Sequence, residues 1–301
     1  MDVHRLVVFL NAGAGSVGDG SISAITEAFE AVAPAVDARI VEVDPADLKE
    51  RLCAEWDASP RPDALVVAGG DGTVNNAANA AAGTDMVIGV LPLGTFNHFA
   101  CDLGLPADLH GAVTALVEGC VRRVDVAEVN GRVFVNNSAV GVYPKMVKIR
   151  DAVMERRGWG KVRAVPAALM HVLRRFPTHR LDLRGSGGFR RHDVRTPLLF
   201  VGNGLFESRP GSAPARASLV DGLLDVRITQ GTTRRGLVRS ALRALLSRKP
   251  AEDDPDQVDL TELEVGARTA HLQVAYDGEV DEFATPLRYR VRPGDLHVLA
   301  P

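Results

Sequence analysis

The sequence predicts two domains of different class, an α/β domain followed by an all-β domain. Through residue 120, short apolar runs that look like strands alternate with longer helical stretches, and strands that are apolar throughout are typical of a parallel sheet covered on both faces. From about residue 122, short strand-like runs follow one another between Gly, Asn and Pro turns, which indicates an antiparallel sandwich or barrel. The length of 301 residues and the hydrophobic content of 46% are enough for two cores.

The elements of the α/β half alternate along the chain. Strands are expected at 6–10, 38–43, 64–68 and 86–91, and helices at 21–33, 45–56, 73–82 and 107–119. In an open parallel sheet, ligands bind outside the carboxyl ends of the strands. The loops after the first, third and fourth strands, "NAGAGS", "GGDGTVN" and "PLGTFNHF", therefore form the predicted binding edge.

The second half is predicted to be rich in short strands. They are expected at 122–129, 132–140, 179–184, 194–202, 223–229, 258–265, 269–276 and 286–292. Two stretches that look helical, 144–175 and 233–248, interrupt them, and residues 250–257 form a polar loop between prolines.

Charge and cysteine content exclude some classes of protein. The net charge of -3, with 24% charged residues, gives no sign of a nucleic-acid-binding surface or of disorder. Cys53, Cys101 and Cys120 are odd in number and widely spaced, so neither a disulfide framework nor a zinc site is expected. A reducing cytosol suits them.

No apolar run is long enough to cross a bilayer, and the short apolar run 6–10 follows Asp2, unlike a secretory signal. We therefore expect a soluble, cytoplasmic protein that meets a membrane only from its inner surface. Two basic segments, 145–175 and 234–249, favour contact with anionic lipid. The alternative, helices docked on their own domain with a solvated cationic face, stays equally open.

The loop after the third strand has the composition of an anion site. Gly69, Gly70 and Gly72 let the backbone approach an anion, and Thr73 begins a helix whose free N–H groups favour negative charge. Asp71 would be repelled by phosphates unless a metal ion lay between them. The loop matches neither the P-loop nor the G-x-G-x-x-G pattern, and a turn closed by glycines for packing is the alternative.

Carboxylates in the second half leave two interpretations open. Asp277 and Glu279 would share one face of an extended strand, but the intervening Gly278 equally indicates a hairpin turn. Asp221, also followed by glycine, raises the same question. The histidines form no metal-binding cluster and there is no G-x-S-x-G motif, so hydrolysis at a zinc or serine centre is disfavoured.

Taken in order, the motifs resemble the diacylglycerol kinase catalytic-domain family, bacterial lipid kinases related to sphingosine kinases and more distantly to NAD kinases. The matching stretches are "GGDGTVNNAANA", "LPLGTFNHFACDLGLP", "VDVAEVNGRVFVNNSAVGV", "ASLVDGLLDVRI" and "YDGEV". The resemblance implies a nucleotide-binding α/β domain at 1–122, on which a C-terminal segment at about 286–301 packs. It also implies a β-sandwich domain for the lipid substrate at 123–285, with an ATP site between the two domains.

The same resemblance implies a set of site residues. Those expected to contact ATP are Asn11, Gly69, Gly70, Asp71, Gly72, Thr73, Val74, Asn75, Gly94, Thr95 and Asn97. Asp71 and Asp125 would join the acidic network around a catalytic Mg²⁺, and Asp221, with groups of Ser218 and Leu223, would bind a structural Mg²⁺. Glu279 would accept the proton of the attacking hydroxyl, although in sphingosine kinases the aspartate matching Asp71 is given that task.

The activity implied is ATP- and Mg²⁺-dependent transfer of the γ-phosphoryl group to a hydroxyl of diacylglycerol or a similar lipid, as in phospholipid biosynthesis. Two departures from the family pattern motivate an alternative, a catalytically impaired regulator that binds lipid or nucleotide. His98 stands where the family carries aspartate, and "NAGAGS" lacks the usual proline and lysine. An NAD kinase relative is another alternative because "GGDGT" is shared, and a homodimer is left open.

Overall fold

A computed structural model of the chain describes residues 3–11, 20–142, 144, 178–207, 215–229 and 257–301. The basic segments 145–175 and 234–249, and most of "NAGAGS", lie outside these ranges. The chain divides into two compact units. Unit 1 comprises Met1–Val126, Val133–Val135 and Arg292–Pro301, and unit 2 comprises Ala127–Arg132 and Asn136–Val291.

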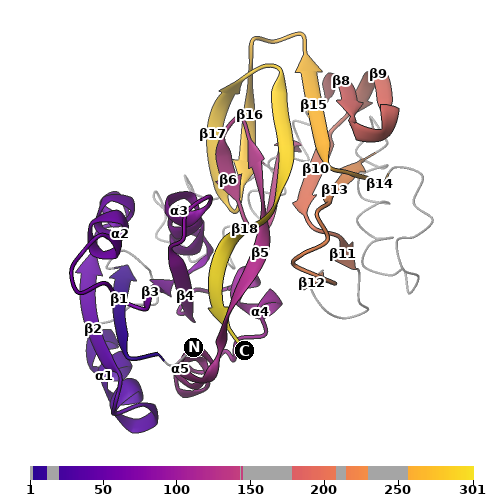
Figure 1. The fold of residues 1–301 in the computed structure, drawn as a ribbon. Coiled ribbons are helices and arrows are strands. Elements are labelled where there is room, and N and C mark those ends of the chain that lie inside the picture. The colour runs from indigo at the N-terminus through magenta and orange to yellow at the C-terminus, as the bar shows by residue number, and fades with distance from the viewer. Residues whose placement is uncertain (1–2, 12–19, 143, 145–177, 208–214, 230–256) are drawn as a thin grey trace. The chain divides into compact units, whose positions relative to one another are not determined.

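Unit 1 is built on a parallel sheet, shown in indigo and purple in Figure 1. Its strands, in spatial order, are β2 (Asp37–Val43), β1 (Arg5–Asn11), β3 (Ala64–Gly69) and β4 (Val87–Pro92). The last part of β18 (Leu287–Ala300) lies parallel to β4, with His297 opposite Val87 and Val298 opposite Ile88. Every residue of β3 and β4 is buried, which is why these strands read as unbroken apolar runs.

Five helices of unit 1 are described: α1 (Ser21–Val32), α2 (Leu48–Trp56), α3 (Asp71–Ala81), α4 (His98–Asp102) and α5 (Leu109–Glu118). The carboxylate of Asp108 caps α5 by accepting a hydrogen bond from the backbone N–H of Gly111 at 2.8 Å. Helix α3 buries small alanine side chains, among them Ala77, Ala78 and Ala81. Small side chains let α3 pack closely against β3 and β4, and only Gly70 separates its first turn from the end of β3.

Asn79 of α3 holds the short strand β6 (Arg132–Phe134) in place. Its Nδ2 donates to the carbonyl oxygen of Val133 at 2.8 Å, and its Oδ1 accepts from the backbone N–H of Val133 at 3.0 Å. We expect Asn79→Ala to lower the free energy of unfolding by about 1 to 3 kcal/mol, because it leaves a buried N–H without an acceptor. Denaturant titration would measure the loss, and Asn76→Ala on the same helix, whose side chain makes no hydrogen bond to β6, should change little.

Most of the described strands of unit 2 form two antiparallel arrays. In the first, the start of β18 pairs with β15 (Glu262–Ala267), followed by β8 (His179–Gly185) and β9 (Arg190–Thr196). The second has the order β14 (Gln257–Leu260), β13 (Leu224–Ile228), β10 (Leu198–Asn203), β7 (Asn137–Gly141), β16 (His271–Tyr276) and β17 (Glu279–Ala284). Strand β5 (Cys120–Val129) pairs with β18 and β6, and β11 (Phe206–Glu207) pairs with β12 (Ala215–Arg216).

The two sheets of unit 2 share a core. Tyr289 of β18 and Ser138 of β7 are both buried, and their hydroxyl oxygens lie 3.2 Å apart in a hydrogen bond that joins the sheets. Burial raises the pKa of the Tyr289 hydroxyl, which therefore stays protonated. Of the two arrangements left open by the sequence, the structure shows the sandwich.

Several elements differ from the sequence prediction. The strand expected at 194–202 is divided at Pro197 into β9 and β10. Helix α4 and strand β17 were not expected, and β18 is longer than the predicted 286–292. No helix within the described ranges combines the length and the apolar character that crossing a bilayer requires.

Candidate active site

The loops that follow β1, β3 and β4 meet at the carboxyl edge of the sheet in unit 1. Asn11, at the end of β1, donates from Nδ2 to Oγ1 of Thr73 in the first turn of α3 at 2.8 Å. Gly94, after β4, lies against Gly70, after β3: a Cβ built on Gly94 would stand 2.4 Å from the Cα of Gly70. The structure thus brings together residues from all three of the predicted binding loops.

The contact between Gly94 and Gly70 requires glycine. A side chain at Gly94 would also meet Oδ1 of Asn97 at 2.6 Å, so backbone touches backbone with no room for a methyl group. Gly69 is similarly enclosed, because a Cβ there would lie 2.5 Å from Oγ1 of Thr73. These glycines serve packing, and the anion-binding interpretation of the glycine-rich loop stays a prediction.

Asn97 shapes the loop after β4. It adopts a left-handed conformation (φ 52°), its Oδ1 accepts from the N–H of Gly94 at 2.9 Å, and its Nδ2 donates to the carbonyl oxygens of Pro92 and Gly94. The carboxamide therefore folds the loop on itself, and Thr95 at its tip is exposed. Contacts of Gly94, Thr95 and Asn97 with ATP stay predictions.

Asp71 lies in the first turn of α3 and is partly exposed. Its Oδ1 accepts from the backbone N–H of His98 at 2.9 Å, and no described residue donates to its Oδ2. The N–H groups of Thr73 and Val74 are both bonded to the carbonyl oxygen of Gly70, so α3 is well formed from its first turn. A helix N-terminus of this kind attracts anions.

His98 replaces the expected aspartate, and the structure shows what it contacts. Its ring stacks on that of Phe96, with 5.7 Å between centroids and 12° between planes. Phe96 is 52% exposed, which is unusual for a large apolar side chain. An aromatic pair therefore borders the glycine-rich loop on the side where the family pattern carries a carboxylate.

Three residues expected at the nucleotide lie beneath the loop. Thr73 and Val74 are each 5% exposed, and Asn75 is fully buried. The Nδ2 of Asn75 donates to the carbonyl oxygen of Val133 at 3.1 Å. This carboxamide supports β6, and direct contact of Asn75 with ATP stays a prediction.

Asp125 is buried on β5, where its Oδ1 accepts from the backbone N–H of Gly294 at 2.7 Å. Arg123 donates from Nε to the carbonyl oxygen of Gly294 at 2.9 Å. Asp125 and Arg123 therefore both anchor β18 at Gly294, which has a positive φ of 58°. Sequence reasoning missed this contact because the two strands are far apart along the chain. Its only signal was the Pro-Gly pair at 293–294, which marks a break in an otherwise regular strand.

The described residues contain no group of three or more His, Cys, Asp or Glu side chains placed to hold a metal ion. Mg²⁺ does not require one, since one or two carboxylates together with substrate phosphates and water complete its shell. Asp71 fits that role because its Oδ2 has no donor among the described residues, and the helix N-terminus beside it would attract the phosphates that complete the shell. His98 contributes no carboxylate.

Two of the three residues expected at the structural Mg²⁺, Ser218 and Leu223, lie beside Gly204. The carbonyl oxygen of Leu223 accepts from the N–H of Gly204 at 2.9 Å, and a Cβ on Gly204 would lie 3.2 Å from the carbonyl oxygen of Ser218. Asp221 is exposed and is followed by Gly222 at φ 66°. The loop therefore brings two backbone carbonyls to one place, which suits an oxygen-seeking cation.

Glu279 lies at the start of β17 in a tight hairpin. Asp277 and Gly278 have φ of 45° and 92°, the positive values of a two-residue hairpin turn, and Tyr276 is paired with Glu279 across it. This decides between the two interpretations of "AYDGEV": the stretch is a turn. Glu279 is exposed, whereas Asp277 accepts hydrogen bonds from the backbone N–H groups of Asn136 and Asn137.

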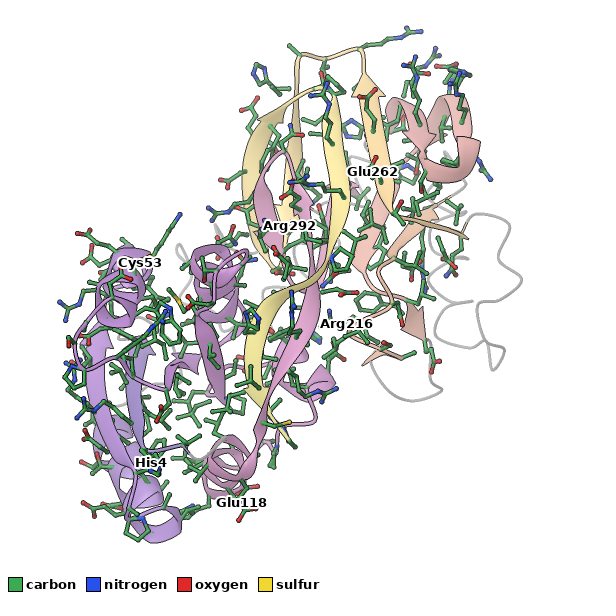
Figure 2. The ribbon with its side chains drawn as sticks, viewed as in Figure 1. His4, Cys53, Glu118, Arg216, Glu262 and Arg292 are labelled. Atoms are coloured by element: carbon green, nitrogen blue, oxygen red, sulfur yellow. The ribbon has the colours of Figure 1, made fainter. Side chains whose placement is uncertain are left out.

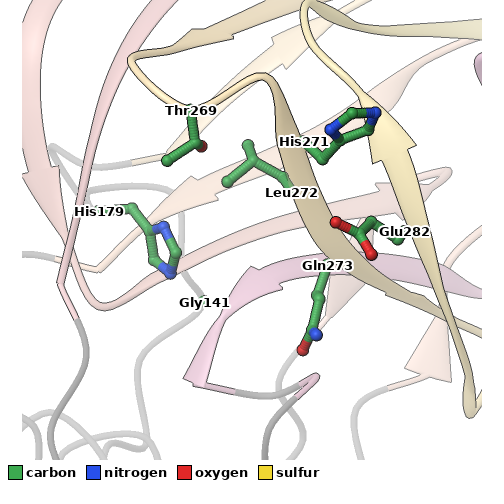
Figure 3. Close-up of a pocket in the computed structure, with 7 residues that line it drawn as sticks. All are labelled: Gly141, His179, Thr269, His271, Leu272, Gln273 and Glu282. Carbon is green, nitrogen blue, oxygen red and sulfur yellow. The ribbon is translucent and has the colours of Figure 1, made fainter.

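Unit 2 also contains a cavity of about 270 Å³, lined by both polar and apolar residues (Figure 3). Its described lining is Gly141, His179, Thr269, His271, Leu272, Gln273 and Glu282. None of the residues predicted for ATP, Mg²⁺ or proton transfer belongs to it.

Two family models cover most of the chain. Residues 5–129 match the diacylglycerol kinase catalytic domain, and residues 147–300 match the YegS C-terminal NAD kinase beta sandwich-like domain. The chain belongs to the YegS/diacylglycerol kinase family of lipid kinases. The α/β and β-sandwich classes predicted from the sequence are thereby confirmed.

Relatives within this lipid kinase family match parts of the chain. A "Probable lipid kinase YegS-like" of Klebsiella pneumoniae is 31% identical over 174 residues, which cover 56% of this chain and 57% of that protein. A "Probable lipid kinase YegS" of Escherichia fergusonii is 29% identical over 203 residues, covering 65% and 64%. A "Diacylglycerol kinase" of Staphylococcus epidermidis is 41% identical over 81 residues, covering 26% of each chain.

The chain thus spans between a half and two thirds of the YegS-type relatives. A crystal structure of a diacylglycerol kinase from Bacillus anthracis superposes on all of this chain and 98% of its own, with a TM-score of 0.71 and 21% identity. At that identity the likeness establishes the family fold alone.

Proposed function

We propose that the protein is an ATP- and Mg²⁺-dependent lipid kinase that transfers the γ-phosphoryl group to a hydroxyl of diacylglycerol or a similar lipid. The observation that carries the proposal is the meeting of three loops around the N-terminus of α3, where Asp71 presents a carboxylate. Membership of the lipid kinase family and relatives with the printed name "Diacylglycerol kinase" support the substrate class.

In this mechanism the glycine-rich loop binds phosphates through backbone N–H groups at the start of α3. Asp71 alone would repel them, and Mg²⁺ bound beside it supplies the charge neutralisation that phosphoryl transfer needs. Glu279 is the proposed acceptor of the proton from the lipid hydroxyl, and its exposure leaves the carboxylate accessible to a substrate. Most of the rate then comes from positioning and electrostatics.

The direct test is transfer of ³²P from γ-labelled ATP into an organic-extractable product. Diacylglycerol and other lipid alcohols, presented in mixed micelles with Mg²⁺, should yield labelled lipid, and NAD should remain unlabelled. Label in NAD with none in any lipid would favour the NAD kinase alternative. Nucleotide binding with no transfer to either would favour the impaired regulator suggested by His98 and "NAGAGS".

Gly94→Ala should weaken ATP binding by at least about tenfold, because the added methyl group separates the two loops by pushing Gly94 away from Gly70. Isothermal calorimetry with MgATP would measure this. Gly20→Ala is the matched control, since a Cβ there meets nothing within 4 Å. Equal affinity in the two variants would show that the contact between these loops does not shape the nucleotide site.

Contact with an anionic membrane surface through 145–175 and 234–249 is part of the proposal and rests on the charge of those segments alone. A cytoplasmic location at the inner membrane surface follows from it. Homodimer formation stays open. Sedimentation with phosphatidylglycerol vesicles, compared with phosphatidylcholine vesicles, tests the charge dependence.

A further inference from the structure

The turn that precedes Glu279 adds a carboxylate contact to the pairing of β16 with β7. Oδ1 of Asp277 accepts two backbone hydrogen bonds, from the N–H of Asn136 at 2.9 Å and from the N–H of Asn137 at 3.0 Å. The N–H of Asp277 donates in return to the carbonyl oxygen of Asn137 at 3.0 Å. The start of β7 and the β16–β17 turn are therefore held in one fixed relation.

We propose that Asp277 is a positioning residue for the phosphoryl transfer: it fixes the turn that presents Glu279, and it does so through the N–H groups of Asn136 and Asn137. The inference rests on the proposed role of Glu279 as proton acceptor. Asp277 need not touch either substrate, because its carboxylate oxygen is occupied by the backbone of unit 2.

The groups that Asp277 contacts are themselves well anchored. Asn136 is 3% exposed, and its carbonyl oxygen accepts from the N–H of Asn203 at 2.9 Å. The carbonyl oxygen of Asn203 accepts in turn from Nη1 of Arg216, a buried guanidinium labelled in Figure 2, at 3.2 Å. Asp277 thus connects the turn to a buried, hydrogen-bonded part of the sandwich.

The hairpin is also rigid within itself. Tyr276 is 2% exposed, its hydroxyl donates to Asp281, and its ring lies 5.4 Å from the guanidinium of Arg132 and 6.1 Å, edge-on, from Phe283. Burial and the hydrogen bond to Asp281 raise the pKa of Tyr276, so it remains a donor at physiological pH. A rigid hairpin transmits the position of its turn to Glu279, two residues beyond Asp277.

Two properties of this position favour aspartate. Its positive φ of 45° favours Gly, Asn or Asp, and the two N–H groups require an acceptor on a short side chain. Substitution can separate these needs. Asn keeps both the acceptor and the tolerance of positive φ, whereas Gly keeps only the tolerance.

The experiment compares Asp277→Gly and Asp277→Asn with the unmodified protein in the lipid kinase assay, with ATP affinity measured by calorimetry. We expect Asp277→Gly to lower kcat by about 10- to 100-fold, since a displacement of about 1 Å in a reacting group has effects of this size. ATP affinity should not change, and Asp277→Asn should stay within about threefold of the unmodified protein. Asp193→Gly is the matched control, since Asp193 is an exposed aspartate of unit 2 with φ of 48°.

Hydrogen–deuterium exchange of peptides that contain Asn136 and Asn137 provides a readout that does not depend on activity. Protection should fall in Asp277→Gly and be kept in Asp277→Asn. Unchanged kcat in Asp277→Gly, or equal losses in the Gly and Asn variants, would overturn the positioning role. An active Glu279→Gln protein would instead remove the proton-acceptor assignment, so the two failures are distinguishable.

Discussion

An Asp71→Asn protein should fold normally, bind ATP and lose roughly 10²- to 10⁴-fold in the rate of phosphoryl transfer. The substitution keeps the Oδ1 that accepts from the N–H of His98, so the loop geometry survives while the negative charge is removed. Metal-dependent charge stabilisation in the transition state contributes several kcal/mol, and each 1.36 kcal/mol corresponds to a factor of about ten in rate.

The same substitution is expected to have the opposite effect on the binding of metal-free ATP, which it should strengthen. Without Mg²⁺, the carboxylate of Asp71 should repel the phosphates of ATP, so Asp71→Asn should bind metal-free ATP about tenfold or more tightly than the unmodified protein. Like charges 4 Å apart repel by about 1 kcal/mol in water and about 4 kcal/mol near a protein surface. Calorimetry with and without Mg²⁺ measures both affinities.

Asp57→Asn is the control for this pair of measurements, because Asp57 is an exposed aspartate in unit 1 that terminates α2. It should reproduce the activity and the Mg²⁺ dependence of the unmodified protein. An Asp71→Asn protein whose ATP affinity still depended fully on Mg²⁺ would show that this carboxylate does not hold the metal ion.

The features that the sequence predicts best are those that depend on local pattern. The buried strands β3 and β4 read as apolar runs because their neighbours in the sheet and the helices on its faces leave none of their side chains exposed. The glycine-rich loop was found because Gly69, Gly70 and Gly72 stand between such a strand and a helix. Strand, turn and helix N-terminus are all short-range properties of the chain.

The features that the sequence analysis missed depend on contacts between residues that are distant in the chain. Strand β17 lies at the edge of its sheet, none of its residues is buried, and neither its sequence nor its burial pattern alternates, so it carries no periodic signal of a strand. Strand β18 continues past Pro293 and Gly294 because Asp125 accepts the N–H of Gly294. Neither the place of β17 in its sheet nor the contact of Asp125 with Gly294 can be predicted from the local sequence.

Motif matching also could not separate residues that face a ligand from those that support the loop. Asn75 and Asn97 belong to recognisable motifs, yet their carboxamides bond to Val133 and to the backbone at Pro92 and Gly94. Asp277, in contrast, looked equally like a turn residue or half of a carboxylate pair. Its positive φ and its two backbone donors became visible only in the folded chain.

Glu279→Gln should lower kcat by roughly 10²- to 10⁴-fold, the usual contribution of a positioned general base. Glutamine has nearly the same shape and the position is exposed, so the free energy of unfolding should change by no more than about 0.5 kcal/mol. ATP affinity should change little, because Glu279 is proposed to act on the lipid hydroxyl and is not among the proposed phosphate-binding residues. Steady-state kinetics with varied lipid and ATP would separate these effects.

Glu262→Gln provides the control, since Glu262 is an exposed glutamate on β15 of the same unit (Figure 2). Together with Asp71→Asn, these variants also decide which carboxylate accepts the proton. If Glu279 is the acceptor, its variant loses kcat without any change in the Mg²⁺ dependence of ATP binding, which only Asp71→Asn should alter. Full activity in Glu279→Gln would exclude Glu279 as the proton acceptor, because loss of a general base typically costs roughly 10²- to 10⁴-fold, and would leave Asp71 as the other carboxylate considered for the role.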